Sequence, residues 1–110
     1  MIFLHGWPSI GLLWRAQMNA FADDGWRCIA PDLRGYGGSS IPADNDSYTI
    51  EEVVADMAEL HDHLGGEPAI WGGHDWGSVV AGDVRGEARQ GATSLRIFSW
   101  TRHRAQRFCL

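Results

Sequence analysis

An aspartate flanked by glycines, directly after a short apolar run, restricts the fold of this chain more than any other feature. Residues 68–71 are apolar, and residues 73–77 read Gly-His-Asp-Trp-Gly. A turn that carries a strand straight into a helix is so tight that flanking side chains would clash, and Gly73 and Gly77 remove that clash. The pattern predicts a strand, a sharp turn that presents Asp75, and a helix beginning near Gly77.

The rest of the chain alternates between strand-like and helix-like apolar patterns. This order predicts a parallel sheet with helices on its faces, an α/β fold. Within the first helix, Trp14, Met18, Phe21 and Ala22 recur at helical spacing and are expected to pack in the core. Strands are predicted for residues 2–4, 26–30 and 68–72, and helices for residues 14–22, 50–64 and from Gly77 to about residue 83.

The second helix has the clearest start. Residues 49–52 read Thr-Ile-Glu-Glu, a capping box in which Thr49 accepts from the third backbone N–H and Glu52 reaches back. Gly65 and Gly66 are expected to end this helix. Its predicted apolar face consists of Ile50, Val53, Val54, Met57, Leu60 and Leu64.

Asp75 narrows the chemistry that such a turn can perform. A serine there would indicate acyl transfer, whereas a carboxylate attacks carbon, opening an epoxide or displacing a halide, and leaves an ester on the protein. Because 14 of the 110 residues are glycine, an ordinary loop is the alternative interpretation of the pentapeptide taken alone.

Three motifs follow the three predicted strands. Residues 5–8 read His-Gly-Trp-Pro, residues 31–37 read Pro-Asp-Leu-Arg-Gly-Tyr-Gly, and residues 73–78 read Gly-His-Asp-Trp-Gly-Ser. Ligands bind at the carboxyl ends of strands in open α/β sheets. As a set, the motifs resemble the α/β-hydrolase family, and within it the epoxide hydrolases, from residue 1 to about 83. The resemblance implies a partial α/β-hydrolase fold that is incomplete at both ends, since family members have strands before and after this part.

The resemblance also implies roles for particular residues. Asp75 would be the nucleophile, and the backbone N–H groups of Trp7 and Trp76 would form an oxyanion hole for charge that develops on the Asp75 carbonyl oxygen. A rigid turn with an aromatic plug is the structural alternative for Trp7 and Pro8. The expected supporting loop residues are His5, Gly6, Pro8, Gly73 and Gly77.

Dehalogenases are the nearest alternative in chemistry, and another α/β-hydrolase activity also stays open. Haloalkane dehalogenases usually carry an asparagine after His-Gly, where this chain has Trp7, and fluoroacetate dehalogenases tend to carry an arginine after the nucleophile, where it has Trp76. Both differences favour a small, apolar, epoxide-type substrate. The Trp76 indole could still donate one hydrogen bond to a halide.

Other polar residues near the motifs are expected to be structural. Asp32 and Arg34 are spaced to pair or to cap nearby backbone, and Tyr36 belongs to the same supporting loop. His74 is expected in packing beside Asp75. His61 and His63 are expected on the surface, without the cysteine or carboxylate pattern of a metal site, and no cofactor is expected.

The residues that would release an ester from Asp75 are not evident. Family members place an acid and then a histidine far downstream of the nucleophile, whereas here the only later histidine is His103, and the only later acidic residues are Asp83 and Glu87. Tyr36 and Tyr48 match no tyrosine of the family's cap domain. The chain is therefore expected to be inactive or incomplete as an enzyme, and a non-catalytic gene fragment is the alternative.

The charge changes sign near residue 84. Residues 1–84 hold three arginines and 13 acidic residues, a net charge of −10, whereas residues 85–110 hold six arginines and one glutamate, a net charge of +5. We expect residues 1–83 to be the N-terminal part of the hydrolase core and residues 84–110 to be an atypical basic tail. A frameshifted or truncated gene end would explain that tail, and a nucleic-acid-binding tail is the rival, although it lacks a folded motif.

Composition excludes several classes of protein. An apolar content of 45% argues against disorder throughout, and no stretch of about 18 apolar residues predicts a membrane span. Met1 leads into the first strand without a signal-peptide pattern. Cys28 and Cys109 form no disulfide framework. The default expectation is a cytoplasmic protein without nucleic-acid or membrane partners, of unknown oligomeric state.

Overall fold

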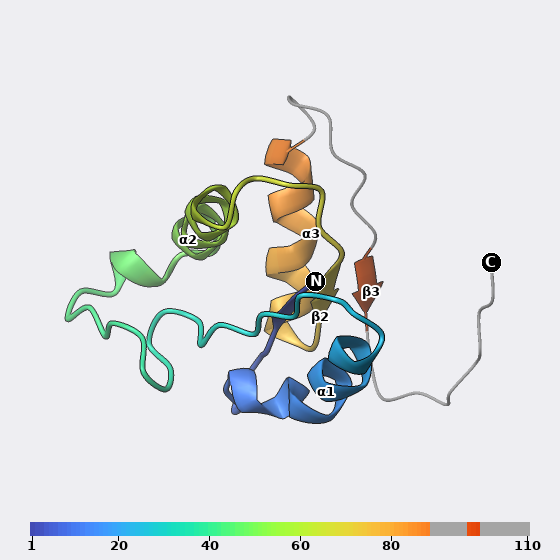
Figure 1. The fold of residues 1–110 in the computed structure, drawn as a ribbon. Coiled ribbons are helices and arrows are strands. Elements are labelled where there is room, and N and C mark those ends of the chain that lie inside the picture. Colours follow the sequence, from blue (N-terminus) through green and yellow to red (C-terminus); the bar gives the residue numbers. More distant parts are fainter. Residues whose placement is uncertain (89–96, 100–110) are drawn as a thin grey trace.

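The computed structural model describes residues 1–88 and 97–99, and within them three short runs pair as a parallel sheet. The strands β1 (Ile2–Leu4), β2 (Trp71–Gly73) and β3 (Ile97–Ser99) lie in the order β1-β2-β3 (Figure 1). β1 and β2 are aligned so that their last residues, Leu4 and Gly73, are partners. The loops that leave these two strands therefore start side by side.

Helices form close to their predicted positions. The short 3-10 helix η1 (Gly11–Trp14) leads into α1 (Arg15–Asp23), and η2 (Asp46–Tyr48) precedes α2 (Ile50–His63). The turn after β2 leads into α3 (Trp76–Ala88). The order confirms the predicted α/β alternation.

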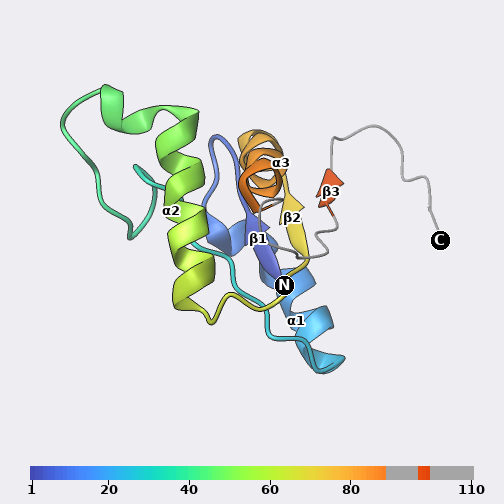
Figure 2. The ribbon, with the colours of Figure 1, turned by 90° about the horizontal axis from the view of Figure 1, so that it is seen from above.

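Successive side chains of β1 point to opposite faces of the sheet, and helices cover both faces. Ile2 and Leu4 join the core cluster under α2 and α3, whereas the Phe3 ring faces the opposite way and stacks on Trp14, with 5.1 Å between ring centroids. Figure 2 shows the strands between α3 on one side and α1 on the other. The buried core consists of Ile2, Leu4, Leu33, Val54, Met57, Trp71, Val80, Ala81 and Val84.

The first helix is less buried than its apolar spacing predicts. Trp14 is buried at the end of η1, but no residue of α1 is, and Ala22 is exposed. Met18 and Phe21 are half-buried, because α1 touches the sheet chiefly through aromatic contacts with Phe3. The prediction that all four residues pack in the core was therefore wrong for Ala22.

The predicted strand over residues 26–30 was wrong in extent. Only Ile29 bridges to Ile2, through the Phe3 N–H to the Ile29 carbonyl at 2.8 Å and the Ile29 N–H to the Met1 carbonyl at 3.0 Å. The Arg27 carbonyl accepts a hydrogen bond from the Met1 amino group, whereas the Trp26 N–H donates to the Phe21 carbonyl at 3.0 Å and not to a strand. Pro31, which lacks an N–H, follows directly and cannot extend the ladder.

The prediction that the last helix breaks at Val84 was also wrong. α3 runs on to Ala88, because Val80, Ala81 and Val84 lie on one helical face buried against the sheet and α2. β3 was not predicted. The division into residues 1–83 and 84–110 stays a prediction, and His103 and most of the basic tail lie outside the described residues.

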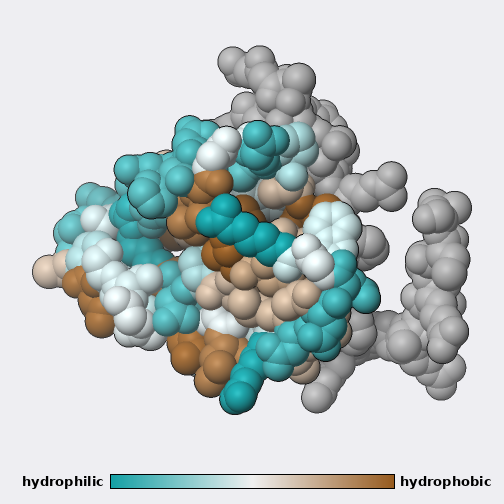
Figure 3. All heavy atoms as spheres, viewed as in Figure 1, coloured by the Kyte–Doolittle hydropathy of each residue, from teal (hydrophilic) through white to brown (hydrophobic). Residues whose placement is uncertain are grey.

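The surface is mostly polar over α2, with an apolar patch over η1 at the lower edge of the view (Figure 3). There Leu12 is 64% exposed and Leu13 is 46% exposed. In the described part of the chain, no helix is both long and apolar enough to cross a bilayer.

Two charged residues brace the loop over residues 31–48. The Asp32 carboxylate accepts hydrogen bonds from the Gly11 N–H at 2.7 Å and the Gly38 N–H at 3.0 Å. Arg34 forms a two-bond contact with Asp56 of α2, at 2.8 and 2.6 Å, and donates to the Ser47 carbonyl. The predicted structural roles of both residues are thus visible, although they do not pair with each other.

The second helix begins as half of the predicted capping box. Thr49 Oγ1 accepts from the Glu52 N–H at 3.4 Å. The Glu52 carboxylate lies 3.4 Å from Arg34 instead of reaching back. Gly65 and Gly66, with φ of 110° and 63°, end the helix as predicted, because residues with side chains rarely adopt such angles.

We predict that Asp32→Asn destabilises the fold by about 1–2 kcal/mol near neutral pH, because an amide cannot replace both acceptor oxygens. Backbone hydrogen bonds from Gly38 and Gly11 hold the pKa of Asp32 below its ordinary 3.8. The stabilisation is therefore present above pH 3.8 and is lost as the pH falls through the lowered pKa.

Urea unfolding followed by tryptophan fluorescence at several pH values measures this difference. Asp24→Asn, at an exposed aspartate that ends α1, is the control. A loss of stability that is the same above and below the pKa of Asp32 would contradict the assignment.

Candidate active site

The parallel pairing of β1 and β2 brings two of the predicted motifs together. Residues 5–8 leave β1 at the edge where residues 74–77 leave β2, and the His74 N–H donates to the Leu4 carbonyl at 3.0 Å. In Figure 1 this edge lies at the lower end of the sheet, beside η1 and the first turn of α3. The site is therefore built from backbone that the sheet itself aligns.

Asp75 sits at the apex of the turn in a conformation that side chains rarely adopt. Its φ is 55°, the only positive value at a non-glycine residue in the described part of the chain. A residue other than Gly, Asn or Asp is uncommon there, and persistent strain of this kind clusters at functional sites. The exposed side chain of Asp75 thus projects from the turn as the sequence predicted.

The glycines at this turn are required by contact with backbone. A Cβ at Gly73 would overlap the backbone of Gly77 and Ser78, and a Cβ at Gly77 would overlap the Leu4 carbonyl and lie 2.5 Å from the His5 carbonyl oxygen. Gly77 is therefore required because the turn lies against the end of β1, and Gly73 because the end of β2 lies against the first turn of α3.

The Asp75 carboxylate is held by backbone donors. The Trp7 N–H donates to Asp75 Oδ1 at 3.0 Å across 68 positions of sequence. Backbone hydrogen bonds from Trp76 first, and then Trp7, hold the pKa of Asp75 below 3.8, with a smaller contribution from the charge of His74. These are the two N–H groups that the resemblance implied. Both hydrogen bonds favour the ionised form of Asp75.

Gly6 lies directly against Asp75. A Cβ at this position would lie 2.5 Å from Asp75 Oδ1 and 2.7 Å from the His74 carbonyl oxygen. Any side chain here would push the Trp7 N–H away from the carboxylate. The Trp7–Pro8 peptide bond that follows is cis.

His5 is fully buried and structural. Its Nε2 accepts from the Leu33 N–H at 2.9 Å, so its proton is on Nδ1, which lies 3.2 Å from the Gly6 carbonyl oxygen. The ring also meets Tyr36 edge-on, with centroids 5.0 Å apart. His5 therefore joins the loop after β1 to the loop at residues 31–37, and both ring nitrogens are in use.

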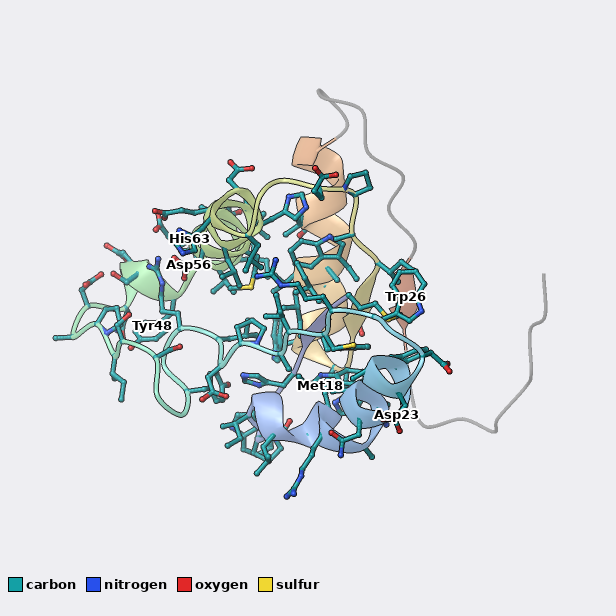
Figure 4. All side chains as sticks on the ribbon, in the orientation of Figure 1. Met18, Asp23, Trp26, Tyr48, Asp56 and His63 are labelled. Carbon is teal, nitrogen blue, oxygen red and sulfur yellow. The ribbon has the colours of Figure 1, made fainter. Side chains whose placement is uncertain are left out.

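The other described histidines are not hydrogen-bonded to Asp75. His61 Nε2 contacts the Glu67 carbonyl at 2.8 Å, and His63 lies near the end of α2 (Figure 4). His74 Nδ1 and Ser78 Oγ are buried without a hydrogen-bond partner. Within residues 1–88 and 97–99, no three His, Cys, Asp or Glu side chains are grouped as metal ligands.

An apolar pocket of about 290 Å³ opens beside the nucleophile turn. It lies between the loop before α2, which carries Tyr48 (Figure 4), and the first turns of α3. The Tyr48 hydroxyl donates to the Pro42 carbonyl at 2.8 Å. The lining residues are Leu33, Arg34, Tyr36, Tyr48, Ile50, Val53, Trp76 and Val80.

The family model for the alpha/beta hydrolase fold matches residues 1–82. The chain belongs to the α/β-hydrolase fold family. This match ends at residue 82, close to the limit of about residue 83 that the motifs predicted for the resemblance. The hydrolase turn, its two glycines and the loop after β1 all lie inside the matched part.

Curated relatives of this α/β-hydrolase chain are named epoxide hydrolases. Epoxide hydrolase A of Mycobacterium tuberculosis is 49% identical over 80 residues, which are 73% of this chain and 25% of that protein. Epoxide hydrolase 2 of Siraitia grosvenorii is 42% identical over 81 residues, 74% of this chain and 26% of that protein. The chain thus spans about a quarter of the length of the curated relatives it matches.

Solved structures agree with this α/β-hydrolase fold. An epoxide hydrolase from Vigna radiata superimposes with a TM-score of 0.81 at 36% identity, over 87% of this chain and 32% of that chain. One from an endophytic Streptomyces gives a TM-score of 0.79 at 38% identity, over 87% of this chain and 29% of that chain. The predicted partial α/β-hydrolase fold is confirmed.

The structure brings most of the predicted site residues to one place, while their catalytic roles stay predictions. Asp75, the backbone of Trp7 and Trp76, and the glycines meet at the sheet edge, and the indoles of Trp7 and Trp76 are 68% and 59% exposed. Sequence reasoning missed Ser9, which bonds to the Gly6 carbonyl. A serine that closes a four-residue turn after proline was the available signal.

We predict that Gly6→Ala breaks the hydrogen bond from the Trp7 N–H to Asp75, because the added methyl overlaps the carboxylate. The pKa of Asp75 should then rise toward 3.8, since one of its stabilising donors is lost. Carbon-detected NMR titration of the Asp75 carboxyl group measures the change.

Gly82→Ala in α3 is the matched control, because a Cβ there meets nothing within 4 Å. It should leave the pKa of Asp75 unchanged. A Gly6→Ala variant that folds and retains the wild-type pKa would show that the contact at Gly6 does not control the carboxylate.

Proposed function

We propose that this chain carries the nucleophile and oxyanion hole of an epoxide hydrolase that opens a small, apolar epoxide to a diol. The observation that carries the proposal is the Trp7 N–H held 3.0 Å from Asp75 Oδ1 at the apex of a strained glycine-flanked turn. The relatives named epoxide hydrolases support the choice of substrate class.

In the first step, the free oxygen of the Asp75 carboxylate attacks a ring carbon of the epoxide. A carbon–oxygen bond to Asp75 forms as the ring carbon–oxygen bond breaks, and the ring oxygen leaves with the electron pair and takes up a proton from water or an acid. Among the described tyrosines, the Tyr48 hydroxyl is engaged with the Pro42 carbonyl. The product of this step is a hydroxyalkyl ester on Asp75.

The Trp7 and Trp76 N–H groups act most strongly in the second step. When water attacks the ester carbonyl, negative charge develops on the carbonyl oxygen, which we propose to be Oδ1, the oxygen that the Trp7 N–H already holds. One such donor is typically worth about 3–4 kcal/mol of transition-state stabilisation. Because Oδ1 is held in this way, the second oxygen is left as the attacking atom.

In the described part of the chain, no histidine is hydrogen-bonded to Asp75 or to a carboxylate that would orient it as a base for that water. His5 uses both ring nitrogens on backbone groups, and His61 contacts the Glu67 carbonyl. We therefore propose that these residues alone form the ester but do not hydrolyse it. A non-catalytic fragment, the alternative, would not react with an epoxide at all.

A dehalogenase is a less well supported alternative. The position after Gly6 holds Trp7, whose indole is largely exposed, so no side-chain amide is present there to hold a departing halide. The Trp76 indole, also exposed, is the single halide donor that the site suggests.

We predict that incubation with styrene oxide adds one equivalent of the epoxide to Asp75, without catalytic release of the diol. Mass spectrometry of the intact chain and of its peptides measures the adduct. Asp75→Asn should abolish the adduct, whereas Asp83→Asn, at an exposed carboxylate of α3, should not. Many turnovers of diol formation by the chain, or labelling that persists in Asp75→Asn, would contradict the proposal.

A further inference from the structure

The peptide group between Gly6 and Trp7 makes hydrogen bonds at both of its ends. Its N–H is the proposed oxyanion donor, and its carbonyl oxygen accepts from other residues. The Gly6–Trp7 peptide presents its N–H to Asp75 Oδ1 at 3.0 Å. The carbonyl of the same peptide points away from Asp75, because the C=O and N–H of a trans peptide lie on opposite sides of one plane. Whatever holds the Gly6 carbonyl therefore also orients the Trp7 N–H.

Three donors converge on that carbonyl oxygen. The Ser9 N–H and the Ser9 hydroxyl both donate to it at 2.9 Å, and His5 Nδ1 lies 3.2 Å away. The Ser9 N–H closes the four-residue turn by itself. The Ser9 hydroxyl is thus an additional contact that turn formation does not require.

Donors on a carbonyl do more than hold the peptide plane. Hydrogen bonds accepted by the C=O polarise the peptide and make its N–H a stronger donor, because chains of hydrogen bonds reinforce one another. Two hydrogen bonds are linked through one peptide group and point in the same direction. The Ser9 hydroxyl donates to the Gly6 carbonyl, and the Trp7 N–H of the same peptide donates to the Asp75 carboxylate. The Asp75 oxygen that accepts the second hydrogen bond is the atom on which the ester's negative charge would develop.

We propose that Ser9 is a positioning residue for the oxyanion hole, acting through the Gly6–Trp7 peptide rather than by touching the substrate. The inference deepens the proposed function and rests on it for its catalytic consequence. Its structural part, the control of the Trp7 N–H by the Ser9 hydroxyl, stands independently of any reaction. His5 supports the same carbonyl, but it also holds Leu33 and cannot be tested separately.

The test compares Ser9→Ala, Ser9→Thr and Ser39→Ala. Ser39 is a matched control, because it is also half-buried and its hydroxyl also donates to a backbone carbonyl, that of Asp32 at 2.6 Å. Ser9→Thr keeps the hydroxyl. Should Ser9→Ala fail to fold, Ser9→Cys takes its place, since a thiol is a weaker and longer donor.

The first readout is NMR of the Trp7 amide proton while Asp75 is titrated. The chemical shift of a hydrogen-bonded amide proton changes as its acceptor ionises. The size of that change therefore measures the strength of the hydrogen bond from the Trp7 N–H to Asp75. Ser9→Ala, or Ser9→Cys, should reduce the change and move the pKa of Asp75 up toward its ordinary value. Ser9→Thr and Ser39→Ala should match the wild type. His74, which also acts on Asp75, is followed in parallel through its ring signals.

The second readout is the rate at which chain labelled with styrene oxide loses its label at alkaline pH, where hydroxide attacks the Asp75 ester. Ser9→Ala should slow this loss by about tenfold, less than the reduction in rate of about 10²–10³ typical when an oxyanion donor itself is removed. Ser9→Thr should restore the rate.

The outcomes separate the two proposals. If the wild type is not labelled but the NMR change depends on the Ser9 hydroxyl, the proposed function fails and the positioning role stands. If Ser9→Ala folds and leaves both the Trp7 shift change and the pKa of Asp75 at wild-type values, the positioning role is overturned.

Discussion

The contact between the turn after β2 and the end of β1 is the constraint on which the rest of the structure depends. Gly77 lies against the carbonyls of Leu4 and His5, and the His74 N–H donates to the Leu4 carbonyl. This approach is possible only because Gly73 and Gly77 lack side chains, and it leaves Asp75 at the apex of the turn with an exposed side chain. The position of Asp75 is thus a consequence of backbone packing at the end of two parallel strands.

Around this contact, buried and charged side chains tie loops that are distant in sequence to the sheet edge. His5 joins the end of β1 to Leu33, Asp32 joins Gly11 to Gly38, and Arg34 fastens the same loop to Asp56 of α2. The polar atoms of each of these three side chains are hydrogen-bonded to backbone groups or paired with an opposite charge. Asp32 and Arg34, which look catalytic by type, are therefore supports, whereas the carboxylate of Asp75, the proposed nucleophile, faces solvent.

The sequence predicted those helix ends and turns that depend on contacts between residues close together in the chain. The Thr49 hydroxyl caps the start of α2, the glycine pair at residues 65–66 ends it through positive φ angles, and the glycine-flanked Asp75 predicted the turn. The extent of a strand depends instead on its neighbour. Residues 26–30 have strand-like composition, yet only Ile29 finds a partner on β1, and α3 continues past Val84 because of burial that a residue-by-residue pattern does not reveal.

Within the site, the sequence and the family resemblance predicted which residues meet but not how they are held. The Trp7 N–H and Asp75 are 68 positions apart, and only the parallel register of β1 and β2 sets their distance. A serine after proline signals only a turn, so the positioning role proposed for Ser9 could not be predicted from the sequence. The proposal for Ser9 depends on the orientation of the Gly6–Trp7 peptide, whose carbonyl contacts Ser9 and whose N–H contacts Asp75.

A crystal structure of the chain after reaction with styrene oxide tests the central claim most directly. The account predicts an ester on Asp75 whose carbonyl oxygen accepts a hydrogen bond from the Trp7 N–H, with the new carbon–oxygen bond on the other carboxylate oxygen. An adduct on a different residue, or an Asp75 ester whose carbonyl oxygen faces away from the Trp7 and Trp76 N–H groups, would contradict it.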